Sequence, residues 1–379
     1  MTSYMWNVPQ PRDTWNVPQP RDTIGIEVTG GARIIVRRHG NPEGPRLILS
    51  HGNGLAADLY YPFWSLLLGR FDLMLYDLRG HGWNPPARLR HHNIATFAAD
   101  QERVRRGIEF HFGAKPAIGV FHSISTLAAL HHDPPGQGYA ALVLLDPPLY
   151  PPDGDPYETA SMLRRACMLA RFRRHRFRTH EEFAEHFRRI STYGHVVAGL
   201  PELASRTLLR PRAGGYELRC PPALEARALE YAFAHCVEPD PARLACPVKV
   251  IGGDPRLESS FLPSTDVGRL HALGYEFVSG TTHFLPIENP TRCVNRMMAF
   301  LEEQGLVDSA APRRPGENQL HRVEAGLRRW GPVVRGGDHS RHLEEPAEGA
   351  GAMAATLKKR RLAPCFNDST SGTATSSSM

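Results

Sequence analysis

The sequence has no C-x-x-C pair, no long apolar run and no strong excess of charge, and each absence excludes a class of protein. No apolar run approaches the ~18 residues of a membrane span, and no charged-then-apolar signal peptide opens the chain. The six cysteines are spaced like neither a zinc site nor a disulfide framework: Cys167, Cys220, Cys236, Cys246, Cys293 and Cys365. We therefore expect a reduced, cytoplasmic protein with no membrane partner, no metal and no other cofactor.

The charge also argues against nucleic acid as a partner. The net charge is +6 over 379 residues. From Val307 onward there are eleven Lys/Arg against eight Asp/Glu, so half of this excess lies at the end of the chain. The remainder is only mildly basic, unlike a nucleic-acid-binding domain.

Composition divides the chain into four parts. Residues 1–23 contain a nine-residue unit, WNVPQPRDT, at 6–14 and again at 15–23, and its proline content predicts an extended arm. Residues 24–150 and 245–306 alternate apolar strand-like runs with helical segments, which predicts an α/β fold with a doubly wound, mostly parallel sheet. Residues 151–244 have helical character and no clear strand, so we expect an inserted helical cap. Residues 307–379 are predicted to be a disordered tail.

A serine in the stretch GVFHSIS, residues 119–125, has the context of a catalytic nucleophile. A strand-like run ends at Phe121 and a helix-like run begins directly after Ser123, which predicts the sharp turn called a nucleophile elbow. Phe121 stands where such a turn normally has a small residue. Ser125 is the alternative nucleophile, but a serine one step into the helix is better placed to bond backbone groups.

A serine nucleophile needs a base and a carboxylate that orients the base. His283 follows the last strand-like run, and Asp254 follows the run before it. We therefore predict the triad Ser123, His283 and Asp254. Asp146, after the run ALVLL, is the alternative acid, although Pro147 and Pro148 behind it favour a structural turn.

The stretch LSHGNG, Leu49–Gly54, follows another strand-like run and is expected to supply an oxyanion-hole amide. We predict the backbone N–H groups of Asn53 and Ile124 as its two donors. Six residues are expected to support the site without reacting: His51, Gly52, Gly54, Asp77, His122 and Ser125. Of these, Asp77 is expected to fix its loop through Arg79 and nearby backbone.

These motifs together resemble the α/β-hydrolase superfamily over about residues 24–306. The resemblance rests on SHGNG, YDLRGHG, FHSIS, GGD and the loop of His283. Within the superfamily, HGNG together with FHSIS is similar to a subgroup of bacterial hydrolases. The resemblance implies the α/β-hydrolase fold, a cap domain and hydrolysis through an acyl-enzyme. The departure from it is Phe121, because the elbow is not Gly-x-Ser-x-Gly.

The predicted function is a serine hydrolase that cleaves a carboxylic ester, thioester or lactone. The same triad would serve a C–C bond hydrolase, an acyltransferase or a perhydrolase. A non-catalytic scaffold that binds a ligand or protein is the alternative of another class. The partner is a small-molecule acyl substrate, and an anionic one is favoured if arginines of residues 164–189 line the cleft.

Overall fold

The computed structural model describes residues 15–149, 156–234, 240–257 and 267–308. The first copy of the repeat (6–14) and almost all of the predicted tail (309–379) lie outside these residues, so the expectations for them stay predictions. No helix of the described residues is long and apolar enough to cross a membrane.

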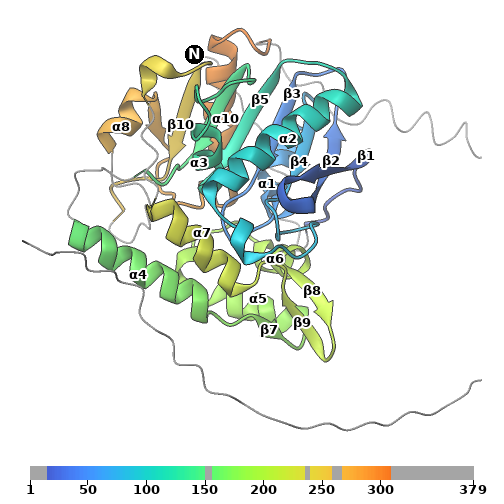
Figure 1. Cartoon of the computed structure of the whole chain (residues 1–379), viewed down its shortest axis with the longest axis vertical. Helices are drawn as coiled ribbons and strands as arrows, with labels where there is room; N and C mark the ends of the chain where they lie inside the picture. Colours follow the sequence, from blue (N-terminus) through green and yellow to red (C-terminus); the bar gives the residue numbers. More distant parts are fainter. Residues whose placement is uncertain (1–14, 150–155, 235–239, 258–266, 309–379) are drawn as a thin grey trace, which may run out of the picture. The chain divides into compact units, whose positions relative to one another are not determined.

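The described residues form an eight-stranded, mostly parallel sheet (Figure 1). Only the pairs β1–β2 and β2–β4 are antiparallel; the other neighbours run parallel. In spatial order the strands are β1 (Asp22–Val28), β2 (Ala32–Gly40), β4 (Asp72–Tyr76), β3 (Arg46–Ser50), β5 (Ala117–His122), β6 (Ala141–Leu145), β10 (Val248–Gly252) and β11 (Tyr275–Phe277). The predicted doubly wound α/β fold is confirmed.

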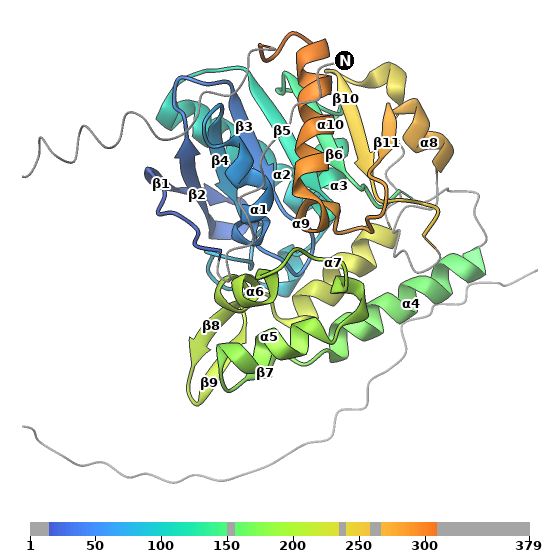
Figure 2. The ribbon, with the colours of Figure 1, turned by 180° about the vertical axis from the view of Figure 1, so that it is seen from behind.

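Helices cover both faces of this sheet, which explains the apolar strands (Figures 1 and 2). On β3, Leu47 and Leu49 enter one hydrophobic cluster and Ile48 enters the other. A strand between two helical layers buries both faces, so its successive central residues are apolar. One face carries α2 (Ile94–Phe112), α3 (Ile124–Leu130) and α8 (Val267–Ala272); the other carries α1 (Tyr61–Trp64), α9 (Leu285–Glu288) and α10 (Pro290–Glu303).

The inserted segment packs on loops that follow β3 and β4. Asn53 Nδ2 donates to Glu225 O at 2.9 Å, and Arg219 Nη1 donates to Gly82 O at 2.9 Å. These loops leave the carboxyl ends of parallel strands, so the insertion covers the edge at which Ser123 lies. We call the insertion the cap.

The expectation of a purely helical cap was wrong. A three-stranded antiparallel sheet of short strands lies beside its helices. The strands have little signal in the sequence because they have two to four residues each, and of these residues only Phe177, Leu209 and Leu218 are buried. The elements are α4 (Pro156–Phe172), β7 (Arg176–Phe177), α5 (His180–Arg188), α6 (Leu200–Leu208), β8 (Leu209–Arg212), β9 (Gly215–Leu218) and α7 (Pro222–Ala234).

The second copy of the repeat is anchored to the domain by its tryptophan. Residues 15–21 have no regular secondary structure, as expected of an extended arm. However, Trp15 is only 7% exposed and its Nε1 donates to Ala198 O at 2.8 Å. Arg206 Nη2 donates to Trp15 O at 2.6 Å, and the Trp15 ring meets Tyr61 edge-on with 6.1 Å between centroids. Trp15 therefore contacts both the cap and the α/β core.

Candidate active site

Ser123 occupies a strained turn between β5 and α3. Its φ is +55° and its ψ is −123°, a region that residues other than glycine rarely adopt. Such strain persists only where the surroundings enforce it, and it is typical of active sites. The geometry is that of a nucleophile elbow, as the sequence predicts.

Ser125 holds the turn closed and is not the exposed hydroxyl. Its Oγ accepts a hydrogen bond from His122 N at 3.0 Å and donates to His122 O at 2.8 Å. Both bonds return to the residue that precedes Ser123. The Ser125 hydroxyl is thus engaged with the backbone of His122, and its supporting role stays a prediction.

Phe121 fits beside the elbow because Gly119 leaves room for its ring. A Cβ on Gly119 would lie 2.6 Å from Phe121 Cε2, so the ring covers the position of the missing side chain. The ring also meets Tyr139 edge-on at 5.7 Å and is fully buried. A usual elbow has a glycine two residues before the serine. Here the glycine is Gly119, four residues before Ser123.

His283 joins Ser123 to a carboxylate. Its Nε2 lies 2.9 Å from Ser123 Oγ, and its Nδ1 lies 2.7 Å from Asp146 Oδ2. The ring therefore donates Nδ1–H to Asp146 and can accept the serine proton at Nε2. Asp146 comes directly after β6, and Gly253 N donates to its other oxygen at 3.2 Å. All three side chains are buried or nearly so.

The expectation that Asp254 orients His283 was wrong. Arg256 holds both Asp254 oxygens, with Nε and Nη2 each at 2.9 Å. Gly280 N donates to the same carboxylate at 2.9 Å. These bonds, first of all those from Arg256, lower the pKa of Asp254 well below its usual range. Asp254 fixes the loop that leads to His283, since its N–H also donates to Thr281 O at 2.7 Å.

The loop that carries the predicted oxyanion donor Asn53 lies beside Ser123. A Cβ on Gly52 would be 3.1 Å from Ser123 Cβ, so the loop of residues 52–54 lies against the elbow. The amides of Gly52 and Gly54 are used by Tyr60 Oη and His81 Nε2, each at 3.1 Å. Neither Asn53 N nor Ile124 N has an acceptor within the described part of the chain. Their role as the oxyanion hole stays a prediction.

A chain of hydrogen bonds connects this loop to His283 through His122. Gly52 N donates to Tyr60 Oη, and the Tyr60 hydroxyl lies 2.6 Å from His122 Nδ1. His122 Nε2 lies 2.8 Å from His283 O. That carbonyl can only accept, so Nε2 carries the ring proton and Nδ1 accepts from Tyr60. Burial lowers the pKa of His122 well below its usual value, so this neutral form persists.

Asp77 and His51 fix the start of the same loop. Asp77 accepts from Ala57 N at 2.8 Å and from Trp83 N at 3.1 Å. Its cationic partner is Arg37, with Nη1 at 2.6 Å from Oδ2. The expectation that Arg79 plays this part was wrong, because Arg79 is paired with Asp100.

His51 accepts from Leu78 N at 3.0 Å through Nε2, and its Nδ1 lies 2.7 Å from Gly52 O. It thereby connects the loop after β3 to the loop after β4, which is the supporting position expected of it.

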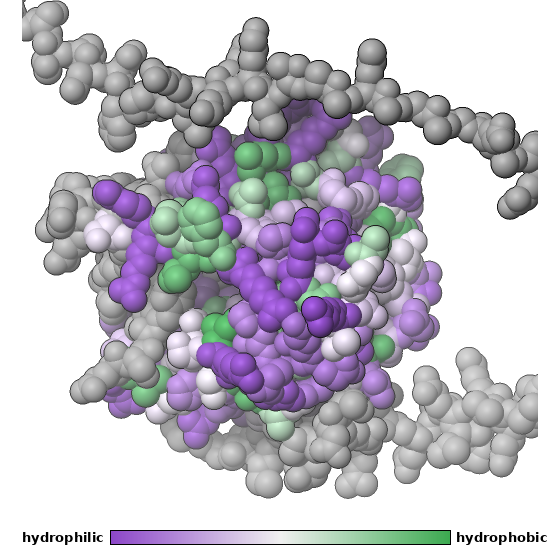
Figure 3. Space-filling model, turned by 90° about the horizontal axis from the view of Figure 1, so that it is seen from below, coloured by the Kyte–Doolittle hydropathy of each residue, from purple (hydrophilic) through white to green (hydrophobic). Residues whose placement is uncertain are grey.

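Most cap arginines are surface residues paired with glutamates. The pairs include Arg171–Glu230, Arg174–Glu182 and Arg188–Glu202. The cap side of the molecule is accordingly mostly hydrophilic, with separate hydrophobic areas (Figure 3). Arg173 differs, because its Nη2 lies 2.7 Å from Glu225 Oε2. The Glu225 carboxylate in turn faces Gly54 of the loop described above.

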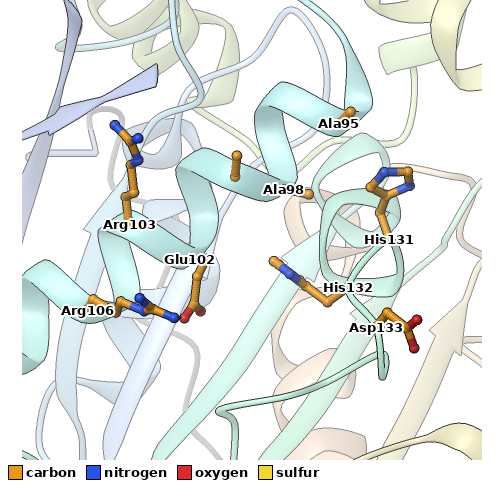
Figure 4. A pocket seen from close by; sticks show the side chains of 9 residues that line it. Ala95, Ala98, Glu102, Arg103, Arg106, His131, His132 and Asp133 are labelled. Atoms are coloured by element: carbon orange, nitrogen blue, oxygen red, sulfur yellow. The ribbon is translucent and has the colours of Figure 1, made fainter. Parts of the chain in front are cut away.

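A separate hollow of about 450 Å³ lies between α2 and the end of α3 (Figure 4). Charged side chains surround it, among them Glu102, Arg103 and Arg106. None of the triad residues lines it, so it is not the place where Ser123 would meet a substrate.

Together, a serine, a histidine and an aspartate at the carboxyl edge of a mostly parallel sheet define the class of α/β-hydrolase proteins. The sequence model of the alpha/beta hydrolase family matches residues 47–296. The chain therefore belongs to this family. A search of curated protein sequences found no significant match.

Three similar solved structures illustrate the range of hydrolases with this fold. One is an E-2-(acetamidomethylene)succinate hydrolase, with a TM-score of 0.60 and 19% identity, covering 74% of this chain and 99% of that one. The second is the thioesterase domain from the curacin biosynthetic pathway, with a TM-score of 0.56 and 18% identity, covering 73% and 98%. The third is a thermophilic esterase from Thermogutta terrifontis, with a TM-score of 0.53 and 18% identity, covering 75% and 99%. At these identities the likeness concerns the fold.

Proposed function

We propose that this protein is a serine hydrolase that cleaves a carboxylic ester, thioester or lactone through an acyl-enzyme. The observation that carries the proposal is the continuous chain from Ser123 Oγ through the His283 ring to Asp146 Oδ2, at 2.9 and 2.7 Å. A hydroxyl, a base and an orienting carboxylate at these distances form the arrangement that activates a serine.

In the first half of the reaction, Ser123 Oγ attacks the carbonyl carbon while His283 Nε2 takes the serine proton. Asp146 keeps its charge and stabilises the imidazolium through Nδ1–H. The carbonyl oxygen becomes negative, and the amides of Asn53 and Ile124 would stabilise it; one such donor contributes ~3 kcal/mol. With an ester or thioester, the alcohol or thiol leaves with the proton of His283 and the acyl group stays on Oγ. With a lactone, the ring oxygen takes this proton and stays attached as a hydroxyl of the acyl group.

In the second half, water attacks the acyl carbon with His283 as the base. The acid product leaves and the proton returns to Ser123, so no metal or organic cofactor enters the balance. An acyltransferase, a perhydrolase or a C–C bond hydrolase would use the same residues with another nucleophile or leaving group. We place hydrolysis first because water needs no binding site of its own.

The names of similar structures support acyl compounds as the substrate class, since they include a thioesterase and an esterase. Within that class we propose a small to medium hydrophobic acyl group. Glu225 already neutralises Arg173, and this removes the reason to prefer an anionic acyl group. With an acidic ester such as a succinate half-ester, we therefore expect slower turnover than with the neutral ester of equal length.

Labelling with a fluorophosphonate probe tests the proposal directly. The expected result is one label per chain, mapped by mass spectrometry to Ser123 and absent in Ser123→Ala. Ser125→Ala is the matched control and should still be labelled. A panel of p-nitrophenyl esters and thioesters of increasing chain length then defines the acyl group. A folded protein without label or turnover would favour the non-catalytic scaffold.

A further inference from the structure

Three side chains that commonly bind metals meet where the cap packs on the core. They are His81 and His92 of the core and Cys220 of the cap, and their potential ligand atoms all lie within 4.8 Å of one another. All three are buried, with exposed fractions of 0%, 0% and 3%. The proposed hydrolase mechanism uses none of them.

Of the three side chains, His92 is the one whose burial its protein neighbours do not account for. Among the described residues, neither of its ring nitrogens has a hydrogen-bond partner. Its neighbours are rings: His81 stacks on it with 5.5 Å between centroids, and Phe97 meets it edge-on at 4.8 Å. A buried imidazole without partners is unfavourable, so this one points to a ligand that satisfies it.

His81 has the hydrogen bond that usually orients a metal-binding histidine. Its Nδ1 lies 3.0 Å from Arg79 O, which can only accept. The proton is therefore on Nδ1, and Nε2 has the lone pair that a metal would need. At present Gly54 N donates to this Nε2 at 3.1 Å, so a metal and the Gly54 amide would compete for the same lone pair.

We propose that His81, His92 and Cys220 bind a soft divalent metal ion of the zinc class and fasten the cap to the core. Two imidazoles and a thiolate are a donor set that suits zinc, and tetrahedral geometry leaves a fourth position for water. The Cys220 thiol loses its proton to solvent when the metal binds. Cys220 adjoins Arg219, which already contacts Gly82 of the core, so the metal would add a bond across an existing contact.

Cobalt binding to the full chain, without a histidine tag and after removal of metals by a chelator, tests this site. We expect one equivalent of Co²⁺ per chain and a thiolate-to-cobalt charge-transfer absorption in the near ultraviolet. Cys220→Ser and His92→Leu should lose this absorption. Cys167→Ser is the matched control, because Cys167 is another buried cap cysteine, and its Sγ donates to Ala226 O at 3.8 Å rather than facing the two histidines. Other histidines could bind cobalt, but only a cysteine ligand produces the charge-transfer band.

Melting temperature supplies a second measurement that does not depend on cobalt spectra. Zinc should raise the melting temperature of the wild type and of Cys167→Ser, but not of Cys220→Ser or His92→Leu. Without metal, His92→Leu should melt higher than the wild type, because it removes two unpartnered nitrogens. The proposal is wrong if wild type shows no thiolate–cobalt absorption, or if the same absorption persists in Cys220→Ser or His92→Leu.

Discussion

Two carboxylates lie at the ends of neighbouring strands, and their immediate partners decide which one faces His283. Asp254 is enclosed by Arg256 and the Gly280 amide, whereas within the described part of the chain Asp146 accepts from the Gly253 amide and the imidazole. A carboxylate whose two oxygens already accept hydrogen bonds from a guanidinium stabilises an additional imidazolium less. At the scale of residues, the hydrogen-bond donors around each carboxylate therefore decide which of the two orients His283.

Asp146→Asn should lower kcat by up to about 10⁴-fold with the fold retained, since an amide no longer stabilises the imidazolium or its tautomer. Asp254→Asn should instead lower the melting temperature, because Arg256 loses its partner, and should change kcat much less. Ester hydrolysis and thermal melts of both variants give the comparison. A larger kcat loss in Asp254→Asn would restore Asp254 as the acid.

Tyr60→Phe removes the hydroxyl that joins the Gly52 amide to His122, and leaves two buried groups unpaired. The unpaired groups should cost ~1–3 kcal/mol of stability. We also expect a lower kcat with little change in KM, because Gly52 adjoins the predicted oxyanion amide of Asn53.

Tyr76→Phe is the matched control for this prediction. The Tyr76 hydroxyl is equally buried and accepts from Gln101 at 3.2 Å. The Tyr76→Phe variant should be less stable than the wild type but should keep the kcat of the wild type. Equal kcat values for the wild type, Tyr60→Phe and Tyr76→Phe would show that Tyr60 and His122 do not position the loop that carries Asn53.

At the scale of elements, β5 shows how a strand can carry a large residue at an elbow. Phe121 uses the space over Gly119, so the two positions are coupled. Phe121→Gly should cost ~3–5 kcal/mol through the lost ring and more through the added flexibility. Gly119→Ala should also destabilise, because its Cβ would lie 2.6 Å from the Phe121 ring and 2.7 Å from Leu142 Cδ2.

The double variant Gly119→Ala/Phe121→Gly should be less destabilised than the sum of the single variants, because the ring that clashes is gone. Urea unfolding of the four proteins measures this coupling. Strict additivity would show that the ring does not occupy the Gly119 position.

Trp15 fastens an irregular segment to the cap and the core. Trp15→Ala should lower stability by ~3 kcal/mol, the low end for losing a buried aromatic ring. Trp6→Ala, in the identical first copy of the repeat, is the matched comparison. Equal losses of melting temperature in the two variants would contradict the assignment of this site to Trp15 alone.

At the scale of the whole molecule, buried histidines make stability depend on pH. Burial, and next Arg37, lower the pKa of His39 to about 4, and burial also lowers that of His122. The unfolded chain has these groups near their ordinary pKa of ~6.5. Between the two pKa values the unfolded state binds more protons, so stability is lost as the pH falls from ~6.5 toward about 4.

We therefore expect a lower urea midpoint at about pH 5 than at about pH 7, before most carboxylates are protonated. His39→Leu should reduce this difference. His111→Leu, at an exposed position of α2, should leave it unchanged. A midpoint that is constant over this range would contradict the prediction.

The sheet was predictable because its signals are local. ALVLL is apolar at every position and RLILS at its three central positions. Such runs separated by helical segments specify a parallel sheet with both faces covered. The cap strands β7, β8 and β9 lack that signal, since they are short and largely exposed. They form only because their partners lie next to them in the folded cap.

The sequence by itself determined Ser123 and His283, because each follows from its position at the end of a strand-like run. It favoured the wrong acid, Asp254 over Asp146, because both follow adjacent strands of the sheet and reach the same edge. The tertiary structure decided between them by bringing Arg256 and Gly280 onto Asp254, and it also placed Trp15 between the cap and the core. Contacts between distant residues have no local pattern in the chain, and for that reason only the folded molecule shows them.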